Sequence, residues 1–125
     1  MDLYRQQILD HYKHPHNFGH LESPDSSVTL YNTACGDKIT IEVHVEKKGK
    51  KVFVTDIAFH GEGCAVSMAS ASMLTDDVKH KEKHEILALE KKDIMQYFEE
   101  ELTPSRTKCA LLPLEVLQKC IQHVA

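Results

Sequence analysis

The hydrophobic pattern of the chain begins as that of a helix. Apolar side chains recur at steps of three and four along residues 3–12, and Pro15 closes the pattern, which predicts an amphipathic opening helix. Residues 14–25 are rich in proline, glycine, asparagine and serine, which favour turns and extended backbone. We therefore expect a surface loop after the first helix.

Three strand-like stretches follow this loop. Residues 28–31 are β-prone, residues 39–45 alternate apolar and polar positions with a period of two, and residues 52–59 end before a pair of glycines. The polar link 46–51 has a central glycine, which suits a hairpin and therefore an antiparallel pair.

The second half of the chain returns to helical patterns. Residues 65–74 are rich in alanine, serine and methionine, and predict a helix whose small side chains permit close packing. Residues 85–102 predict a further helix or pair of helices, and apolar residues at helical spacing along 114–124 predict a last one. The whole pattern predicts one α+β domain over residues 1–125, with a small three-stranded antiparallel sheet packed against several helices.

Composition narrows the class of protein. The chain has 125 residues, 42% of them hydrophobic, and a net charge of -4 with no long basic run, which argues against nucleic acid and anionic membrane as main partners. It has neither an apolar stretch near the roughly 20 residues that span a bilayer nor the apolar core of a secretory signal. We expect a soluble cytoplasmic protein, whose four cysteines serve metal binding, catalysis or burial rather than disulfides.

Two of the cysteines lie where predicted elements meet. Cys35 precedes Gly36 and Asp37 in the link between the first two strands, and residues two apart in extended backbone share a side, so a thiolate and a carboxylate can face one cation. A loop cysteine beside a turn-forming aspartate is the alternative. Cys64 follows a Gly-x-Gly run at a predicted helix start, where free backbone N–H groups favour a thiolate; a small buried cysteine is the alternative there.

A third cysteine extends this pattern. A helix tolerates Pro113 only near its first turn, which predicts that Cys109 lies at or just before a helix start, with Arg106 and Lys108 adding positive charge nearby. The spacing of the three thiols matches no zinc finger and no Cys-x-x-Cys motif. Their places at element boundaries favour a shared tetrahedral metal site with Asp37 at one end of the layer.

The remaining cysteine and the histidines have a different character. Cys120 falls within the predicted last helix beside its apolar stripe, and we interpret it as structural. Most of the nine histidines belong to polar segments and are expected in solvent. His60, four residues before Cys64, is the histidine nearest the proposed site, and we favour a strand-end side chain over a ligand there.

Four segments of the chain together match one known pattern. They are residues 3–15, with the ending Asp-His-Tyr-Lys-His-Pro, Cys35-Gly36-Asp37, residues 61–74, beginning Gly-Glu-Gly-Cys-Ala, and Arg106-Thr107-Lys108-Cys109-Ala110. The chain resembles the NifU/IscU/SufU family of iron-sulfur cluster assembly proteins. The likeness runs from the first predicted helix to the last.

Within that family the chain is most similar to the SufU branch. The scaffold branch typified by IscU has a histidine directly before the third cysteine, and this chain has Lys108 there, with Arg106 two residues earlier. SufU proteins usually carry an inserted segment before this motif, whereas here Thr103-Pro104-Ser105 leads into it directly.

The resemblance implies a zinc ion held by Cys35, Asp37, Cys64 and Cys109. It also implies that the protein accepts sulfane sulfur from a SufS-like or IscS-like cysteine desulfurase and supplies a downstream iron-sulfur scaffold or apoproteins. Cys35, on a loop with a glycine, is then the expected sulfur acceptor, and Arg106 supports the released thiolate. The alternatives are a scaffold that builds and passes on a [2Fe-2S] cluster, and a purely structural zinc. Thiolates bind both metals, so the sequence does not choose between zinc and iron.

Overall fold

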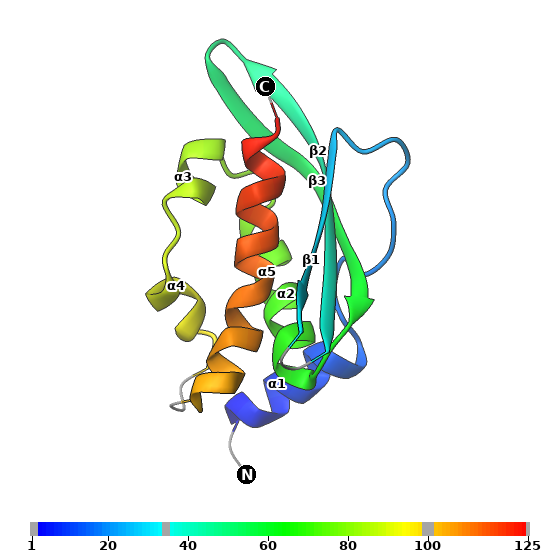
Figure 1. Ribbon diagram of the computed structural model, residues 1–125. Helices are drawn as coiled ribbons and strands as arrows, with labels where there is room; N and C mark the ends of the chain where they lie inside the picture. Colours follow the sequence, from blue (N-terminus) through cyan, green and yellow to red (C-terminus); the bar gives the residue numbers. More distant parts are fainter. Residues whose placement is uncertain (1–2, 34–35, 99–101, 125) are drawn as a thin grey trace.

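The sheet and its helices follow the predicted order. The computed structural model describes residues 3–33, 36–98 and 102–124 (Figure 1). The sheet has the order β1-β2-β3, and both strand pairs are antiparallel, which confirms the predicted sheet and fold class. The elements are α1 (Leu3–Lys13), β1 (Ser26–Asn32), β2 (Asp37–Lys48), β3 (Lys51–Glu62), α2 (Ala65–Val78), α3 (Lys83–Leu87), α4 (Lys91–Met95) and α5 (Pro104–Gln122).

The central strand β2 divides the molecule into two faces. Ile39, Ile41 and Val43 are fully buried and belong to the core, whereas the residues between them point to the opposite face because side chains alternate along a strand. Strand β2 continues to Lys48 and turns back at Lys51 through Gly49 (φ +64°), as the predicted hairpin requires. The alternation seen in the sequence therefore describes the real two-sided sheet.

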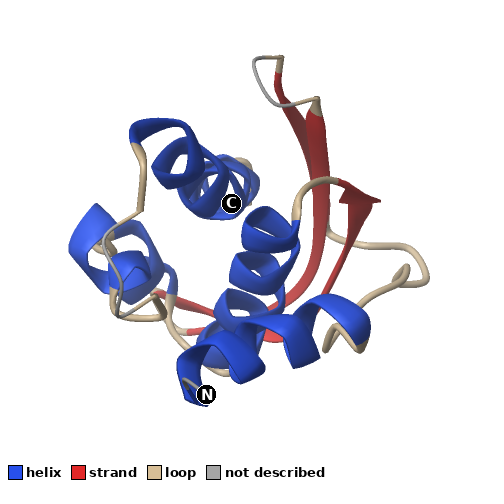
Figure 2. Cartoon of the chain, turned by 90° about the horizontal axis from the view of Figure 1, so that it is seen from below, coloured by secondary structure: helices blue, strands red, loops and turns tan. Residues whose placement is uncertain are grey.

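Helices α2 and α5 pack on the inner face of the sheet, α1 lies against α2, and α3 and α4 lie outside α5 (Figures 1 and 2). Close packing between α2 and α5 depends on small side chains. The hydroxyl of Ser70 donates a hydrogen bond to the carbonyl of Ala110 on α5 at 2.6 Å. The small residues of α2 that are fully buried are Ser67, Ala69, Ser70, Ala71 and Ser72.

Among the described helices, none combines the length and the apolar character that crossing a membrane needs.

The start of α5 corrects the sequence prediction. The helix begins at Pro104, because Thr103 caps it by accepting the N–H of Arg106 at 3.3 Å and proline suits a first helical position. Pro113 consequently lies inside the helix, and Cys109 lies in its second turn rather than at or before its start.

The helix continues through Pro113 because burial outweighs the break. An interior proline costs about 3 kcal/mol, since it has no N–H for the carbonyl four residues earlier. Leu114, Leu117 and Ile121 follow it and are buried, and each contributes about 1.5–3 kcal/mol. The apolar face beyond the proline therefore decides the length of α5.

The loop after α1 is fixed to the edge and the outer face of the sheet. The N–H of Phe59 donates to the carbonyl of Asn17 at 2.9 Å, and the N–H of Gly19 donates to the carbonyl of Phe59 at 2.8 Å. Just before β1 begins, the N–H of Asp25 donates to the carbonyl of Val43 on β2 at 2.8 Å. Residues 17–25 thus pass from β3 to β2 as a surface loop that several backbone hydrogen bonds hold in place (Figure 1).

Helix α1 and the same loop are both attached to α2 by polar side chains. Nδ1 of His11 lies 2.6 Å from the hydroxyl of Ser72, and the carboxylate of Asp76 contacts His16 and accepts from the amide of Asn17 at 2.9 Å. Burial, and then the nearby His16, lower the pKa of His11. Burial alone raises the pKa of Asp76, but the hydrogen bonds from His16 and Asn17 outweigh it and hold that pKa below its usual value.

At Gly61, near the end of β3, the backbone passes very close to Lys38 of β2 before the chain enters α2. An added Cβ there lies 2.0 Å from the carbonyl oxygen of Lys38, whereas at Gly19, which has a similar φ (+141° against +146°), nothing lies within 4 Å. We expect Gly61→Ala to lower the free energy of unfolding by about 1–3 kcal/mol more than Gly19→Ala, because only Gly61 adds a steric clash to the backbone strain. Urea unfolding measures both variants, and equal losses would contradict the close approach.

Candidate metal centre

Three elements bring Asp37, Cys64 and Cys109 together. Asp37 opens β2 and shares the inner face with Ile39. Cys64 lies between β3 and α2 and caps α2, and Cys109 projects from the second turn of α5. One possible ligand atom of each residue lies within 4.8 Å of those of the other two. A carboxylate oxygen and two thiols are thus close enough to face a single ion.

The carboxylate of Asp37 is the best-defined part of this group. Its side chain is 1% exposed, and its Oδ1 accepts the backbone N–H of Cys64 at 3.0 Å. Among the described residues, the other oxygen, Oδ2, is buried with no hydrogen-bond partner. A buried polar atom without a partner costs about 1–3 kcal/mol, more when charged, so this oxygen is suited to receive a cation. The donor set of sulfur and oxygen fits zinc, and thiolates also fit iron.

Glycine at position 63 allows the strand end to approach this carboxylate. An added Cβ there lies 2.3 Å from Oγ of Ser67 and 2.9 Å from Oδ1 of Asp37. The same serine hydroxyl donates to the carbonyl of Cys64 at 3.1 Å, and so closes the first turn of α2. The Gly-x-Gly run therefore serves close packing around Asp37 and Cys64.

The predicted site residues fall into three groups. Cys64 stands at a helix start, as expected, and is partly exposed, while Cys109 is 2% exposed and stands inside a helix. Arg106 is exposed on the first turn of α5. Cys35, the predicted fourth ligand and sulfur acceptor, lies outside the described residues.

Cys120 is apart from this centre. It is fully buried on α5, its thiol donates to the carbonyl of Ile41 at 3.5 Å, and burial raises its pKa. None of the described cysteines forms a disulfide. A buried thiol with these contacts packs as a small apolar side chain.

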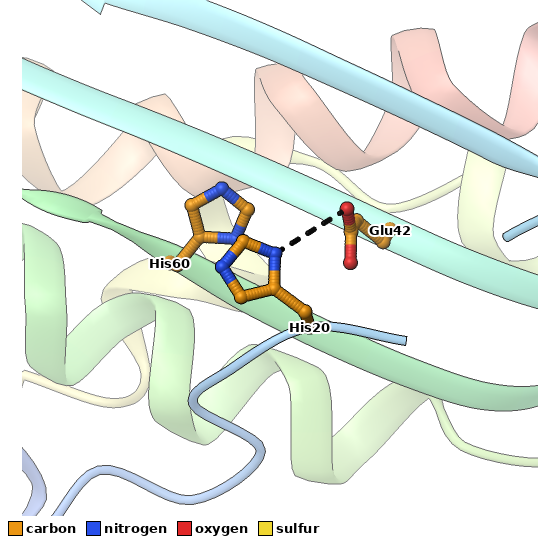
Figure 3. A group of neighbouring side chains, drawn as sticks. All are labelled: His20, Glu42 and His60. Atoms are coloured by element: carbon orange, nitrogen blue, oxygen red, sulfur yellow. Dashed lines mark ion pairs between the residues drawn. The ribbon is translucent and has the colours of Figure 1, made fainter. Parts of the chain in front are cut away.

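His60 lies on the other face of the sheet. It is grouped with His20 and Glu42, and their possible ligand atoms also lie within 4.8 Å of one another (Figure 3). Sequence reasoning missed this cluster. The antiparallel strands and their alternation could have placed Glu42 and His60 on one face, but no local signal brings His20 from the loop to them.

The family model described as the NifU-like N terminal domain matches residues 3–124 of the chain. The chain belongs to the NifU-like N-terminal domain family. It is 38% identical to the zinc-dependent sulfurtransferase SufU of Bacillus subtilis, over 94% of this chain and 88% of that protein. It is 36% identical to the iron-sulfur cluster assembly scaffold protein IscU of Streptococcus pyogenes, over 98% of this chain and 85% of that one.

The fold of this NifU-like domain has relatives among solved structures. The crystal structure of a NifU-like protein (N-terminal) from Brucella abortus superposes with a TM-score of 0.74 at 24% identity, and covers 96% of this chain and 92% of that one. The alignment with the Bacillus protein is 135 positions long, so that relative has residues without a counterpart in this chain of 125.

Zinc binding to this centre is expected to stabilise the fold. At free zinc 100 times the dissociation constant, binding adds about 2.7 kcal/mol, which corresponds to roughly 10 °C in Tm for a domain of this size. Cys109→Ser should lose most of this zinc-dependent shift, because it removes one ligand. Cys120→Ala, whose thiol lies outside the centre, should keep it. Thermal unfolding in a zinc buffer measures both variants, and an undiminished shift in Cys109→Ser would remove this residue from the centre.

Proposed function

We propose that this protein takes part in iron-sulfur cluster assembly as a zinc-bound sulfur acceptor of a cysteine desulfurase. The zinc ligands in this proposal are Cys35, Asp37, Cys64 and Cys109. The observation that carries it is the convergence of Asp37, Cys64 and Cys109, with a buried carboxylate oxygen that lacks a partner among the described residues. The similarity to a protein named as a zinc-dependent sulfurtransferase supports the same proposal.

Zinc, when bound, keeps the thiols of the centre deprotonated without redox activity of its own. The chain supplies two kinds of thiolate around it. Cys64 caps α2 and Cys109 lies on α5, two helices whose packing holds them in place, and the N–H of Cys64 orients Asp37. Cys35 belongs to the short link between β1 and β2, beside Gly36 at φ +71°. We therefore assign the role of acceptor to Cys35.

The proposed transfer is a thiol exchange. The thiolate of Cys35 attacks the outer sulfur of the desulfurase persulfide, and a new S–S bond forms on Cys35. The bond from that sulfur to the desulfurase cysteine breaks, and its electron pair leaves with the desulfurase thiolate. The exchange needs no external oxidant or reductant. In this proposal Arg106, which is exposed on the first turn of α5, meets the docked partner and stabilises the displaced thiolate.

The recipients in this proposal are a downstream iron-sulfur scaffold or apoproteins. The proposed compartment is the cytoplasm, where thiols stay reduced between turnovers. An exposed persulfide would be lost to other thiols, so transfer is expected to occur within a protein complex.

A second candidate function is a scaffold for a [2Fe-2S] cluster. The similarity to the Streptococcus IscU scaffold favours it, and the same thiolates suit iron. Asp37 in place of a fourth thiolate suits a cluster that is passed on, because oxygen binds iron-sulfur clusters less firmly than sulfur does. Metal content separates the two candidates.

Protein purified without added metal is expected to be colourless and to carry close to one zinc per chain, because three thiolates and one carboxylate complete a tetrahedral shell. Elemental analysis and a visible absorption spectrum measure this. A brown preparation with equal iron and labile sulfide and little zinc would contradict the zinc proposal and favour the scaffold.

Sulfur transfer itself is tested with the cysteine desulfurase and cysteine. The protein is expected to stimulate desulfurase turnover, and Cys35→Ala is expected to abolish that stimulation, because the variant lacks the thiolate that acts as nucleophile in this proposal. Cys120→Ala is the matched control and should stimulate nearly as the unmodified protein does. If Cys35→Ala still stimulates the desulfurase while Cys109→Ala does not, then Cys109 is the sulfur acceptor and the assignment of Cys35 is wrong.

A further inference from the structure

We propose that His20, Glu42 and His60 form a second metal site, for a divalent transition ion such as zinc, on the outer face of the sheet. The three residues come from the loop before β1, from β2 and from β3 (Figure 3). They lie on the side of the sheet away from α2 and α5. This site is independent of the cysteine centre and of the function proposed for it.

The sheet register places two of the ligands together. His60 pairs with Thr40 in the β2–β3 ladder, and Glu42 is two residues further along β2, so both side chains leave the same face as diagonal neighbours. Glu42 is 12% exposed, so its carboxylate is held in a largely enclosed position beside the strand.

The loop adds the third ligand. The rings of His20 and His60 lie with their centroids 4.0 Å apart, and Nδ1 of His20 lies 3.9 Å from Oε2 of Glu42. One possible ligand atom of each residue lies within 4.8 Å of those of the other two. Two imidazoles and a carboxylate therefore face one another over a distance that a single ion can bridge.

Backbone groups of the same loop orient these side chains. Oε1 of Glu42 accepts the N–H of Leu21 at 2.8 Å, and Nδ1 of His60 lies 3.2 Å from the carbonyl of Gly19. Outer hydrogen bonds of this kind are what fixes the tautomer and direction of metal-binding histidines and carboxylates. The loop itself is held to β3 by the hydrogen bond from Gly19 to Phe59, so the position of the loop backbone does not depend on the exposed His20 ring.

The donor set selects the kind of ion. Imidazole nitrogen and carboxylate oxygen suit zinc and its neighbours, whereas magnesium and calcium prefer oxygen alone. Three protein ligands leave a coordination position open. The cluster borders an open depression of about 670 Å³ whose other walls are side chains of the sheet, among them Thr29, Lys38 and Glu62. The bound ion is therefore open to water and exchangeable.

The test begins with protein whose cysteine centre is already saturated with zinc. Isothermal titration with further zinc should show a second equivalent. His20→Ala and Glu42→Gln should each lower the affinity for this second zinc ion tenfold or more, the range seen when a metal site loses a supporting or binding group. Glu42→Gln keeps an oxygen for the N–H of Leu21, and His20 is 72% exposed, so neither change threatens the fold.

His84→Ala is the matched control. His84 also pairs with a glutamate, at 3.0 Å from Glu82, but the two belong to no group of three ligands in the described part of the chain. The His84→Ala substitution should leave the affinity for the second zinc ion unchanged. Cobalt added to the zinc-saturated protein gives a second readout, because a paramagnetic ion at the site should broaden the NMR signals of the His20 and His60 rings before those of His84.

Two results would overturn the proposal. One is that zinc-saturated protein takes up no second ion in excess zinc. The other is that His20→Ala and His84→Ala weaken the second equivalent equally. Neither result changes the zinc content of the cysteine centre, so failure here is separate from failure of the proposed function.

Discussion

The alternation of side chains along β2 is the constraint on which the rest of the structure depends. Ile39, Ile41 and Val43 are fully buried, and each contributes about 1.5–3 kcal/mol on the inner face. A slip of one residue in register would turn all three to the outer face, so the pairing with β1 and β3 is strongly specified. The same register sets Asp37 toward the helices and Glu42 toward the loop, and both candidate sites follow from it.

The cysteine centre also depends on how the ends of three elements are joined. Gly61 and Gly63 let β3 pass close to the start of β2, so the N–H of Cys64 reaches the carboxylate of Asp37. The small side chains of α2 let α5 approach, which brings Cys109 to the same place. Backbone approach and small-residue packing, rather than sequence spacing, therefore create the group of ligands, which explains why the spacing of the cysteines resembles no known metal motif.

The sequence predicts much of the fold because its elements have clear periods. The strands, the hairpin at Gly49 and the close-packed helix of alanines and serines are all present. The sequence places the start of α5 wrongly, because Pro113 favours a first turn there, whereas the helix begins at Pro104 behind the cap at Thr103 and continues through Pro113. The sequence could not place His20 beside Glu42, because the path of this long loop is set by hydrogen bonds with backbone groups that are distant in the sequence.

The two candidate sites, five residues apart on β2 but on opposite faces, differ in ways that separate their chemistry. At the inner one, a buried carboxylate and thiols favour a tightly held ion, because burial excludes the water that would replace a ligand. At the outer one, an exposed histidine and an open depression favour exchange with solvent. The loop 17–25 covers the outer face only in part, and its backbone contacts with Glu42 and His60 orient ligands without enclosing them. One strand can thus carry a retained ion and an exchangeable one without direct competition, because the donor atoms and the access of water differ.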